Sequence, residues 1–224
     1  MELTILMPCL NEEKTIAYCI DEALAFLKKS GLSGEILIAD NGSSDKSVML
    51  AGEKGARVIN VKEKGYGAAL RAGIKAARGR YIIYADADMS YNFMDCSQIY
   101  RSLLLGNALV VGNRFNSYME KGAMPFSHKF FGVPLLSFLG RLKYRVGVRD
   151  FHCGLRGLDK QAVEGLSFHT TGMEFATEII AAFSGAGLPI SQVNIRFRKD
   201  KRGGRSHLRT LRDGFRHLIY IAFN

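Results

Sequence analysis

The chain has 224 residues, 47% of them hydrophobic, which suits one globular domain with a substantial core. Its four cysteines form no C-x-x-C pair, so neither a disulfide framework nor a cysteine zinc site is indicated. The net charge of +10 indicates an anionic partner: nucleic acid, an acidic membrane surface or a phosphorylated substrate. We expect an unprocessed, cytoplasmic chain, because no apolar run reaches the roughly 18 residues of a membrane-spanning helix and the N-terminus lacks signal-peptide features.

Apolar runs bounded by Gly, Pro and Asn alternate along the chain with segments of helical periodicity. Strands are predicted at residues 3–7, 35–40, 57–61, 81–85, 108–112, 150–158 and 189–198, and helices at 13–30, 47–54, 65–79, 128–147 and 172–187. This alternation favours an α/β fold with a single Rossmann-like, mostly parallel sheet flanked by helices.

Polar or glycine-rich residues follow five of the predicted strands directly. They are the runs "PCLNEE", "DNGSSD", "KEKGYG", "DADMS" and "GNRF". Parallel α/β sheets bind their ligands beyond the carboxyl ends of the strands. The sequence therefore predicts a ligand site at that edge of the sheet.

Asp86 and Asp88 follow a predicted strand and point to the same side if the extended backbone continues through them. Two such carboxylates repel each other unless a cation lies beside them, and ligands with oxygen donors only favour Mg²⁺ or Mn²⁺. The alternative is a pair of solvated turn carboxylates. Asp40 ends the neighbouring strand, where it would accept hydrogen bonds from a base or ribose, or else cap a turn.

Other signatures narrow the choice of function. Gly65 and Gly67 precede a predicted helix, where backbone can approach a nucleotide, but their spacing departs from the redox dinucleotide motif. The first strand is not followed by the glycine-rich basic loop that is typical of a sugar nucleotidyltransferase. That class of enzyme remains an alternative. A nucleic-acid-binding module is a second alternative that rests on charge alone, and we expect no nucleic-acid partner.

The ordered runs "ILMPCLNEEKTI", "ILIADNGSSDKS", "GYGAALRAGIKAARGRYIIYADADMS" and "VVGNRF" resemble the family 2 glycosyltransferases, whose A-type fold is a nucleotide-binding α/β sheet. The runs "DFHCGLRG", "TTGMEFATE" and "RSHLRTLRDGFRHL" extend the resemblance to the bacterial dolichyl-phosphate-sugar-synthase-like branch. The likeness covers nearly the whole chain.

The resemblance implies transfer of a sugar, with inversion, from a UDP- or GDP-sugar to a polyprenyl (undecaprenyl or dolichyl) phosphate at the cytoplasmic face of the membrane. It implies Mg²⁺ or Mn²⁺ at Asp86 and Asp88. The remaining positions that it assigns to the nucleotide sugar are Pro8, Asn11, Glu12, Asp40 and Gly67. Ser90 stands where mannose synthases of this branch carry glutamine, so mannose is not implied and water would complete the metal shell.

The chemistry of the acceptor decides whether the site needs a general base. A phosphate with a second pKa of about 6 is largely ionised at neutral pH and needs no general base. A hydroxyl acceptor, which is the alternative, would need one. The resemblance implies Asp88, Arg114, Asp150 and Glu174 as the catalytic candidates, with Asp150 or Glu174 as the base for a hydroxyl acceptor, and Arg114, Arg202, Arg205 and Ser206 as the candidates for binding phosphate.

Residues 206–224 read as a basic amphipathic helix that follows a catalytic domain of residues 1–205. Leu211, Phe215, Leu218 and Ala222 form an apolar stripe among arginines. Such a helix lies in an anionic bilayer interface or, alternatively, packs its stripe on the domain. Members of this branch usually carry membrane-spanning helices after the catalytic domain, whereas this chain stops at Asn224, so it is either a truncated piece or meets its acceptor peripherally. The oligomeric state is left open.

Overall fold

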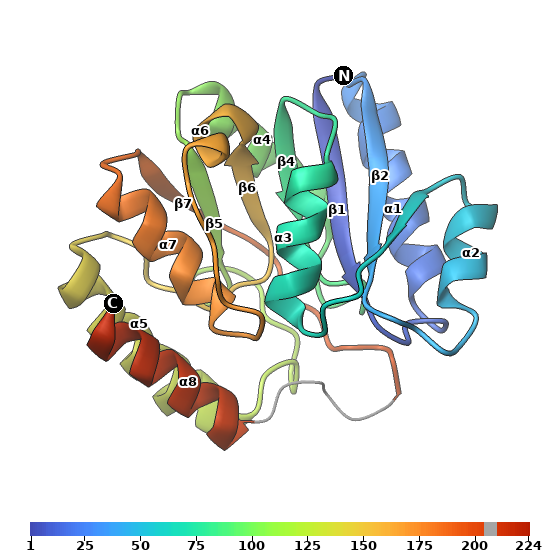
Figure 1. Cartoon of the computed structure of the whole chain (residues 1–224). Helices are drawn as coiled ribbons and strands as arrows, with labels where there is room; N and C mark the ends of the chain where they lie inside the picture. The colour runs from blue at the N-terminus through green and yellow to red at the C-terminus, as the bar shows by residue number, and fades with distance from the viewer. Residues whose placement is uncertain (204–209) are drawn as a thin grey trace.

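The described part of the chain, residues 1–203 and 210–224 of a computed structural model, folds around a seven-stranded sheet (Figure 1). The strands are β1 (Leu3–Cys9), β2 (Gly34–Asp40), β3 (Arg57–Asn60), β4 (Tyr81–Tyr84), β5 (Leu109–Asn113), β6 (Arg156–Asp159) and β7 (Ile190–Asn194). Their order in the sheet is β3-β2-β1-β4-β6-β5-β7. The predicted single, mostly parallel α/β sheet is confirmed, and β6 alone runs antiparallel to its neighbours.

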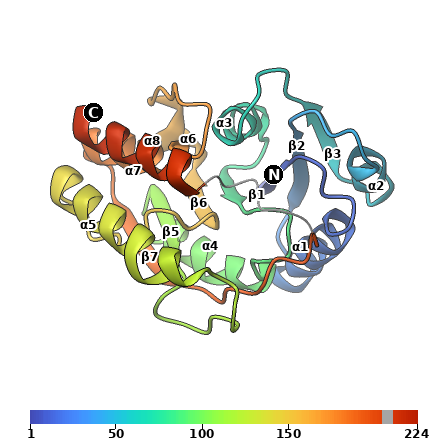
Figure 2. The same ribbon diagram turned by 90° about the horizontal axis from the view of Figure 1, so that it is seen from below.

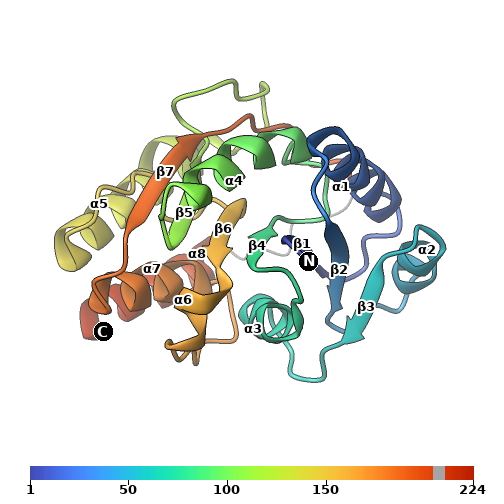
Figure 3. The ribbon, with the colours of Figure 1, turned by 90° about the horizontal axis from the view of Figure 1, so that it is seen from above.

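Helices cover both faces of this sheet (Figures 2 and 3). They are α1 (Ile16–Ser30), α2 (Ser47–Glu53), α3 (Tyr66–Ala76), η1 (Phe93–Asp95), α4 (Cys96–Leu104), η2 (His128–Gly132), α5 (Val133–Tyr144), α6 (Lys160–Glu164), α7 (Phe175–Gly185) and α8 (Thr210–Phe223). Helices α1 and α4 contact each other on one face, and α3 contacts α7 on the other.

The core lies around β1, which is buried at each of its seven residues. A parallel strand covered on both faces is apolar almost throughout, which is why the run after Glu2 lacks polar alternation. On one side, α1 packs Ile16, Ile20, Ala23 and Leu27, which recur at helical spacing along a single stripe.

The strand order reverses between β1 and β4. From β1 the chain builds β2 and β3 outward on one side, whereas β4 lies on the other side of β1. Such a reversal leaves a crevice at the carboxyl ends of the two central strands. Because Leu6 pairs with Tyr84, the end of β1 and the residues after β4 emerge side by side at this crevice.

The antiparallel strand β6 lies between β4 and β5. Its register pairs Arg156 with Tyr84, so the loop before β6 reaches the same edge as the residues after β4. Gly154 in this loop lies so close to β4 that a Cβ atom there would be 2.7 Å from Oδ2 of Asp86. A parallel β6 would place this loop at the opposite edge of the sheet.

Helix α8 packs against α5 and α7, beside which it lies in Figure 1. Its inward face carries Asp213, His217 and Ile221, which are all buried. Among the described residues, the helices are too short or too polar to cross a membrane.

Candidate active site

A cavity of about 910 Å³ opens at the carboxyl edge of the sheet, over the crevice between β1 and β4. Its wall is formed by the ends of these strands, the start of α3, the loop before β6, the segment before α7, and parts of α5 and α8. This volume lies within the range of about 300–1,000 Å³ that is usual for small-molecule pockets.

Asp86 and Asp88 both line this cavity, although β4 ends at Tyr84, before them. Burial, and then the negative charge of Asp88, raise the pKa of Asp86 to about 6. Oδ1 of Asp88 accepts hydrogen bonds from the backbone N–H of Ser90 at 2.9 Å and from its hydroxyl at 2.5 Å. Ser90, which stands where mannose synthases of this branch carry glutamine, therefore orients Asp88.

Arg202 reaches into the same place from the segment after β7. Its Nη1 donates to Oε1 of Glu12 at 3.1 Å, and its Nη2 lies 3.4 Å from Oδ2 of Asp88. Asp200 accepts two further bonds from this guanidinium. Burial raises the pKa of Glu12 to about 7 against the opposing positive charge of Arg202.

The residues here fit a hard divalent cation. Asp86 and Asp88 supply oxygen donors on one wall, and a cation beside them would relieve the repulsion that raises the pKa of Asp86. Among the described residues, no three His, Cys, Asp or Glu side chains group as a metal site. A two-carboxylate set matches Mg²⁺ or Mn²⁺ that shares its remaining positions with substrate phosphates and water.

At the β1 end of the cavity, Pro8 and Glu12 are in its wall, whereas Asn11 and Asp40 are not. Asp40 accepts the backbone N–H groups of Gly42 at 3.0 Å and of Ser43 at 3.2 Å, so it caps the turn after β2. Asn11 caps the neighbouring loop, because its Oδ1 accepts the N–H of Ser44 at 2.8 Å. Asp40 and Asn11, which were predicted to bind the nucleotide, thus hold loops next to the cavity. Asn41 and Lys64 line the cavity at this place.

Close packing explains why position 67 is glycine, and the sequence did not reveal this. A Cβ atom at Gly67 would lie 2.7 Å from the carbonyl oxygen of Thr170 and 2.9 Å from that of Gly172. Gly65, at φ +130°, approaches Thr171 in the same way. These glycines let α3 meet the segment before α7, and of the two only Gly65 is in the cavity wall.

Arg114 lines the cavity and is held by Asp150. Its Nε and Nη2 each donate to the Asp150 carboxylate at 2.7 Å, and its guanidinium stacks 5.1 Å from the centre of the Phe197 ring. Asp150 is fully buried and is not in the cavity wall. The structure therefore brings these two predicted catalytic residues together, with only the arginine lining the cavity.

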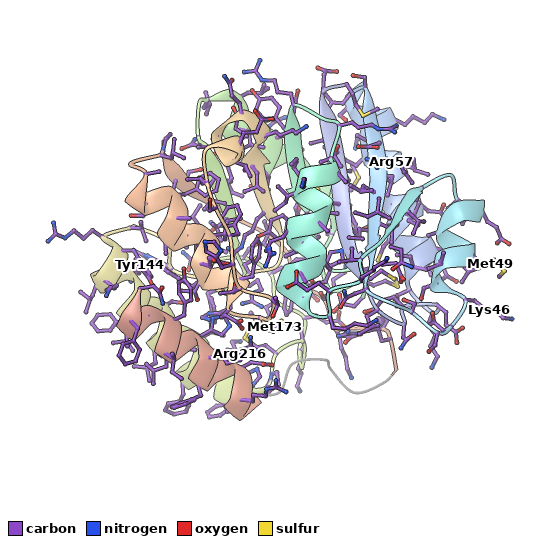
Figure 4. All side chains as sticks on the ribbon, viewed as in Figure 1. Lys46, Met49, Arg57, Tyr144, Met173 and Arg216 are labelled. Carbon is purple, nitrogen blue, oxygen red and sulfur yellow. The ribbon has the colours of Figure 1, made fainter. Side chains whose placement is uncertain are left out.

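Glu174 likewise lies behind the wall. Its Oε1 accepts hydrogen bonds from the N–H of Gly172 and from Arg216, while its Oε2 is buried with no hydrogen-bond partner among the described residues. Arg216 of α8 and Met173, both labelled in Figure 4, form this part of the wall.

Two histidines, the buried His217 and the half-buried His152, lie next to Arg216 and Glu174. Nδ1 of His217 is 2.8 Å from the Thr177 hydroxyl, and its ring lies 4.3 Å from that of His152, edge to face. Burial, with Arg156 and Arg216 nearby, lowers the pKa of His217 to about 4.

Several cavity residues escaped the sequence reasoning. They are Tyr66, His128, His152, Arg156, Arg212 and Asp213. No local sequence pattern marks these residues as cavity residues, because contacts between residues far apart in the sequence bring them to the cavity. The predicted phosphate ligands Arg205 and Ser206 lie outside the described residues.

Comparisons with known proteins identify the family of this chain. The family model described as glycosyl transferase family 2 matches residues 4–166. The low-salt glycan biosynthesis hexosyltransferase Agl6 of Haloferax volcanii is 35% identical over 223 residues, which are 99% of this chain and 53% of Agl6. Dolichyl-phosphate beta-glucosyltransferase of Drosophila melanogaster is 28% identical over 221 residues, 88% of this chain and 67% of that protein. The chain thus spans about half the length of Agl6.

Solved structures share the fold. The crystal structure of glucosyl-3-phosphoglycerate synthase from Mycobacterium tuberculosis, in complex with Mn²⁺, UDP and phosphoglyceric acid, aligns with a TM-score of 0.78 at 24% identity, covering 99% of this chain and 78% of that one. The predicted A-type glycosyltransferase fold is therefore confirmed. The relatives also agree with the predicted dolichyl-phosphate-sugar-synthase-like branch. On the ordered motifs, the sheet topology and a family match over most of its length, the chain belongs to glycosyl transferase family 2.

Proposed function

We propose that the chain is an inverting glycosyltransferase that moves a hexosyl group from a UDP- or GDP-sugar to a polyprenyl phosphate, with Mg²⁺ or Mn²⁺. Family membership and the hexosyltransferase and dolichyl-phosphate glucosyltransferase relatives support the reaction class. One observation supports the lipid acceptor most directly: parts of two helices, α5 and α8, form the cavity wall, and the outer faces of both helices expose large apolar side chains.

In the transfer, an oxygen of the acceptor phosphate attacks the anomeric carbon of the donor sugar from the face opposite the leaving group. The bond between that carbon and the β-phosphate oxygen breaks, and the nucleoside diphosphate leaves with the bonding electrons. Asp86 and Asp88 would hold the divalent cation, which supplies Lewis-acid stabilisation of the departing diphosphate. Arg202 places a positive charge beside the same oxygens, where it stabilises the charge that develops as the bond breaks.

The cavity wall suits an acceptor that is already ionised. The predicted bases Asp150 and Glu174 are both bound to arginines and lie behind the wall. We propose that Asp150 positions Arg114, whose charge faces the incoming phosphate, and that Glu174 positions Arg216 in the same way. A phosphate acceptor needs no proton removed, so this arrangement is sufficient for it.

The outer faces of α5 and α8 suit a bilayer surface. The large apolar side chains that these helices expose, with those of the adjoining η2 segment, are Phe126, Phe130, Phe131, Leu135, Phe138, Leu142, Phe215, Leu218, Ile219 and Phe223. An ordinary surface helix turns its apolar face toward the core, whereas both of these helices turn polar residues such as Ser137 and His217 inward. Exposed patches of this kind mark interaction sites.

The basic residues Lys129, Arg141, Lys143 and Arg212 lie on these same segments and would meet anionic headgroups. We therefore propose that the chain binds peripherally to the cytoplasmic face of the membrane. The predicted alternative, in which α8 packs its stripe on the domain, does not fit Phe215, which is 63% exposed. The side chain of Leu211 lies outside the described residues.

The proposal is tested by measuring release of UDP and GDP from a panel of nucleotide sugars, with and without undecaprenyl phosphate in detergent. We expect release that depends on the lipid phosphate, needs Mg²⁺ or Mn²⁺ and stops with EDTA. The sugar that transfers then identifies the donor. Donor turnover that ignores both the lipid phosphate and EDTA would overturn the proposal.

A hydroxyl acceptor is the alternative that one observation favours. Asp213 of α8 is a carboxylate in the cavity wall on the acceptor side. Turnover that requires a hydroxyl compound, and is lost in Asp213→Asn, would assign the base to this residue and replace the lipid phosphate as acceptor.

A further inference from the structure

The segment after β7, residues 195–203, passes along the cavity as an extended strap and carries Arg202. Figure 2 shows it leaving β7 and running past α4 toward α1. Its first part continues the sheet, because the N–H of Ile195 donates to the carbonyl of Asn113 at 3.1 Å. Phe197, Asp200 and Arg202 of the strap are in the cavity wall.

The strap is paired by its backbone with the segment that contains Asp88. The N–H of Arg198 donates to the carbonyl of Ser90 at 2.8 Å, and that of Lys201 donates to the carbonyl of Asp88 at 3.1 Å. A β-bridge also joins Phe197 to Tyr91. The register of this pairing decides whether Arg202 stands beside Asp88.

One side chain ties both segments to the body of the fold. Glu22 projects from α1 and accepts hydrogen bonds from Nη1 of Arg198 at 3.0 Å and from Nη2 at 2.8 Å. Its Oε2 also accepts the backbone N–H of Phe93, at 2.9 Å, from the end of the Asp88 segment. The opposite face of α1 is buried against the sheet, so Glu22 is anchored on a rigid element.

We propose that Glu22 is a positioning residue for the diphosphate site: it clamps the strap to the Asp88 segment so that Arg202 and Asp88 meet the same diphosphate. This inference rests on the proposed function. Glu22 is not itself in the cavity wall and acts through Arg198 and the Phe93 backbone. Small errors in the position of such groups are costly for binding and transfer, which is why an indirect residue matters.

The clamp is tested without any ligand by limited trypsin digestion of the Glu22→Gln variant. Glutamine keeps one acceptor oxygen, loses the charge and turns an NH₂ group toward the arginine donors. We expect cleavage after Lys199 and Lys201 to be faster by about fivefold, because proteolysis follows the population of the locally open strap. Mass spectrometry identifies the cut sites.

The matched control is Glu35→Gln. Glu35 makes a similar two-bond pair with Arg57, at 2.8 and 3.0 Å, and lies at the start of β2, away from the cavity. We expect trypsin to cut the strap of the Glu35→Gln variant at the wild-type rate. Equal strap cleavage in the two variants would overturn the inference.

The second readout is calorimetric binding of UDP and GDP in the presence of Mg²⁺. We expect Glu22→Gln to weaken binding by about tenfold, the usual effect of losing a residue that orients metal or phosphate ligands. Arg198→Gln should do the same, and the double variant should be no weaker than either single one, because the two residues act as a unit. Binding within twofold of wild type in Glu22→Gln would contradict the proposal.

These outcomes separate the two claims. If wild type binds neither nucleotide, the donor in the proposed function fails, while the trypsin experiment still decides whether Glu22 holds the strap. If wild type binds a nucleotide and both readouts leave Glu22→Gln unchanged, the clamp fails and the proposed function stands.

Discussion

A carboxylate acts as a general base only where it reaches the acceptor, and Asp150 is instead enclosed with Arg114. The pair is fully buried on the aspartate side and makes two hydrogen bonds of 2.7 Å. A buried arginine without its counter-charge is costly, so the aspartate keeps Arg114 both ionised and oriented. Glu174 stands in the same relation to Arg216.

Asp150→Asn should therefore destabilise the protein by about 3 kcal/mol, because it leaves Arg114 buried without its partner charge. Urea denaturation at pH 7 measures this loss. A general base would behave differently: its removal would abolish the acidic limb of the pH–rate profile and leave the free energy of unfolding nearly unchanged. That second result would return Asp150 to the catalytic role.

At the scale of elements, α8 has a polar inner face that forms part of the cavity wall and an apolar outer face. Phe215 is 63% exposed and Phe223 is 82% exposed, whereas His217 on the inner face is buried. Sequence periodicity alone identified the apolar stripe but not the direction in which it points. Packing against α5 and α7 decided that direction, because the polar face found hydrogen-bond partners in α7.

Phe223→Ser should weaken binding to anionic phospholipid vesicles by about tenfold, since a buried phenylalanine side chain contributes about 1.5–3 kcal/mol. The melting temperature of the variant should change little, because the Phe223 side chain is mostly exposed. Cosedimentation with vesicles measures the binding. Leu105→Ser is the matched control: Leu105 is 84% exposed at the end of α4. If the two variants bind vesicles equally, the outer face of α8 is not the membrane surface.

For the whole molecule, His152 and His217 make stability depend on pH. Burial, with positive charges from Arg156 of β6 and Arg216 of α8, lowers the pKa of His217 to about 4, and burial lowers that of His152 as well. The folded state then binds fewer protons than the unfolded state between these values and the ordinary pKa of about 6.5. The stabilisation is present above pH 6.5 and is lost as the pH falls toward 4.

The free energy of unfolding should thus fall between pH 7 and pH 5, and His217→Gln should reduce that fall by about 2 kcal/mol. Glutamine retains a group able to hydrogen bond Thr177 but takes up no proton. Denaturant titrations of both proteins at the two pH values measure the difference. Parallel pH curves for wild type and variant would show that His217 already titrates normally in the fold.

The sequence by itself determined the fold class and the edge of the sheet at which the cavity lies. Buried parallel strands are continuous apolar runs, and their polar endings predicted where Asp86, Asp88 and Glu12 would meet.

The end of one helix differs from the prediction: the helix predicted at 65–79 ends at Ala76. Gly79 is there because a Cβ atom would lie 2.4 Å from the backbone nitrogen of Thr4.

Only the tertiary structure shows which of the predicted polar residues line the cavity. Asp40, Asn11 and Gly67 satisfy neighbouring loops and helices, and Asp150 and Glu174 bind arginines behind the wall. It likewise shows that Glu22, which in the sequence is an ordinary helix-surface glutamate, contacts Arg198 and the backbone of Phe93. The physical reason is the same in each case: local patterns follow from chain periodicity, whereas the partner of a charged side chain is set by contacts between residues far apart in the sequence, here Glu22 with Arg198.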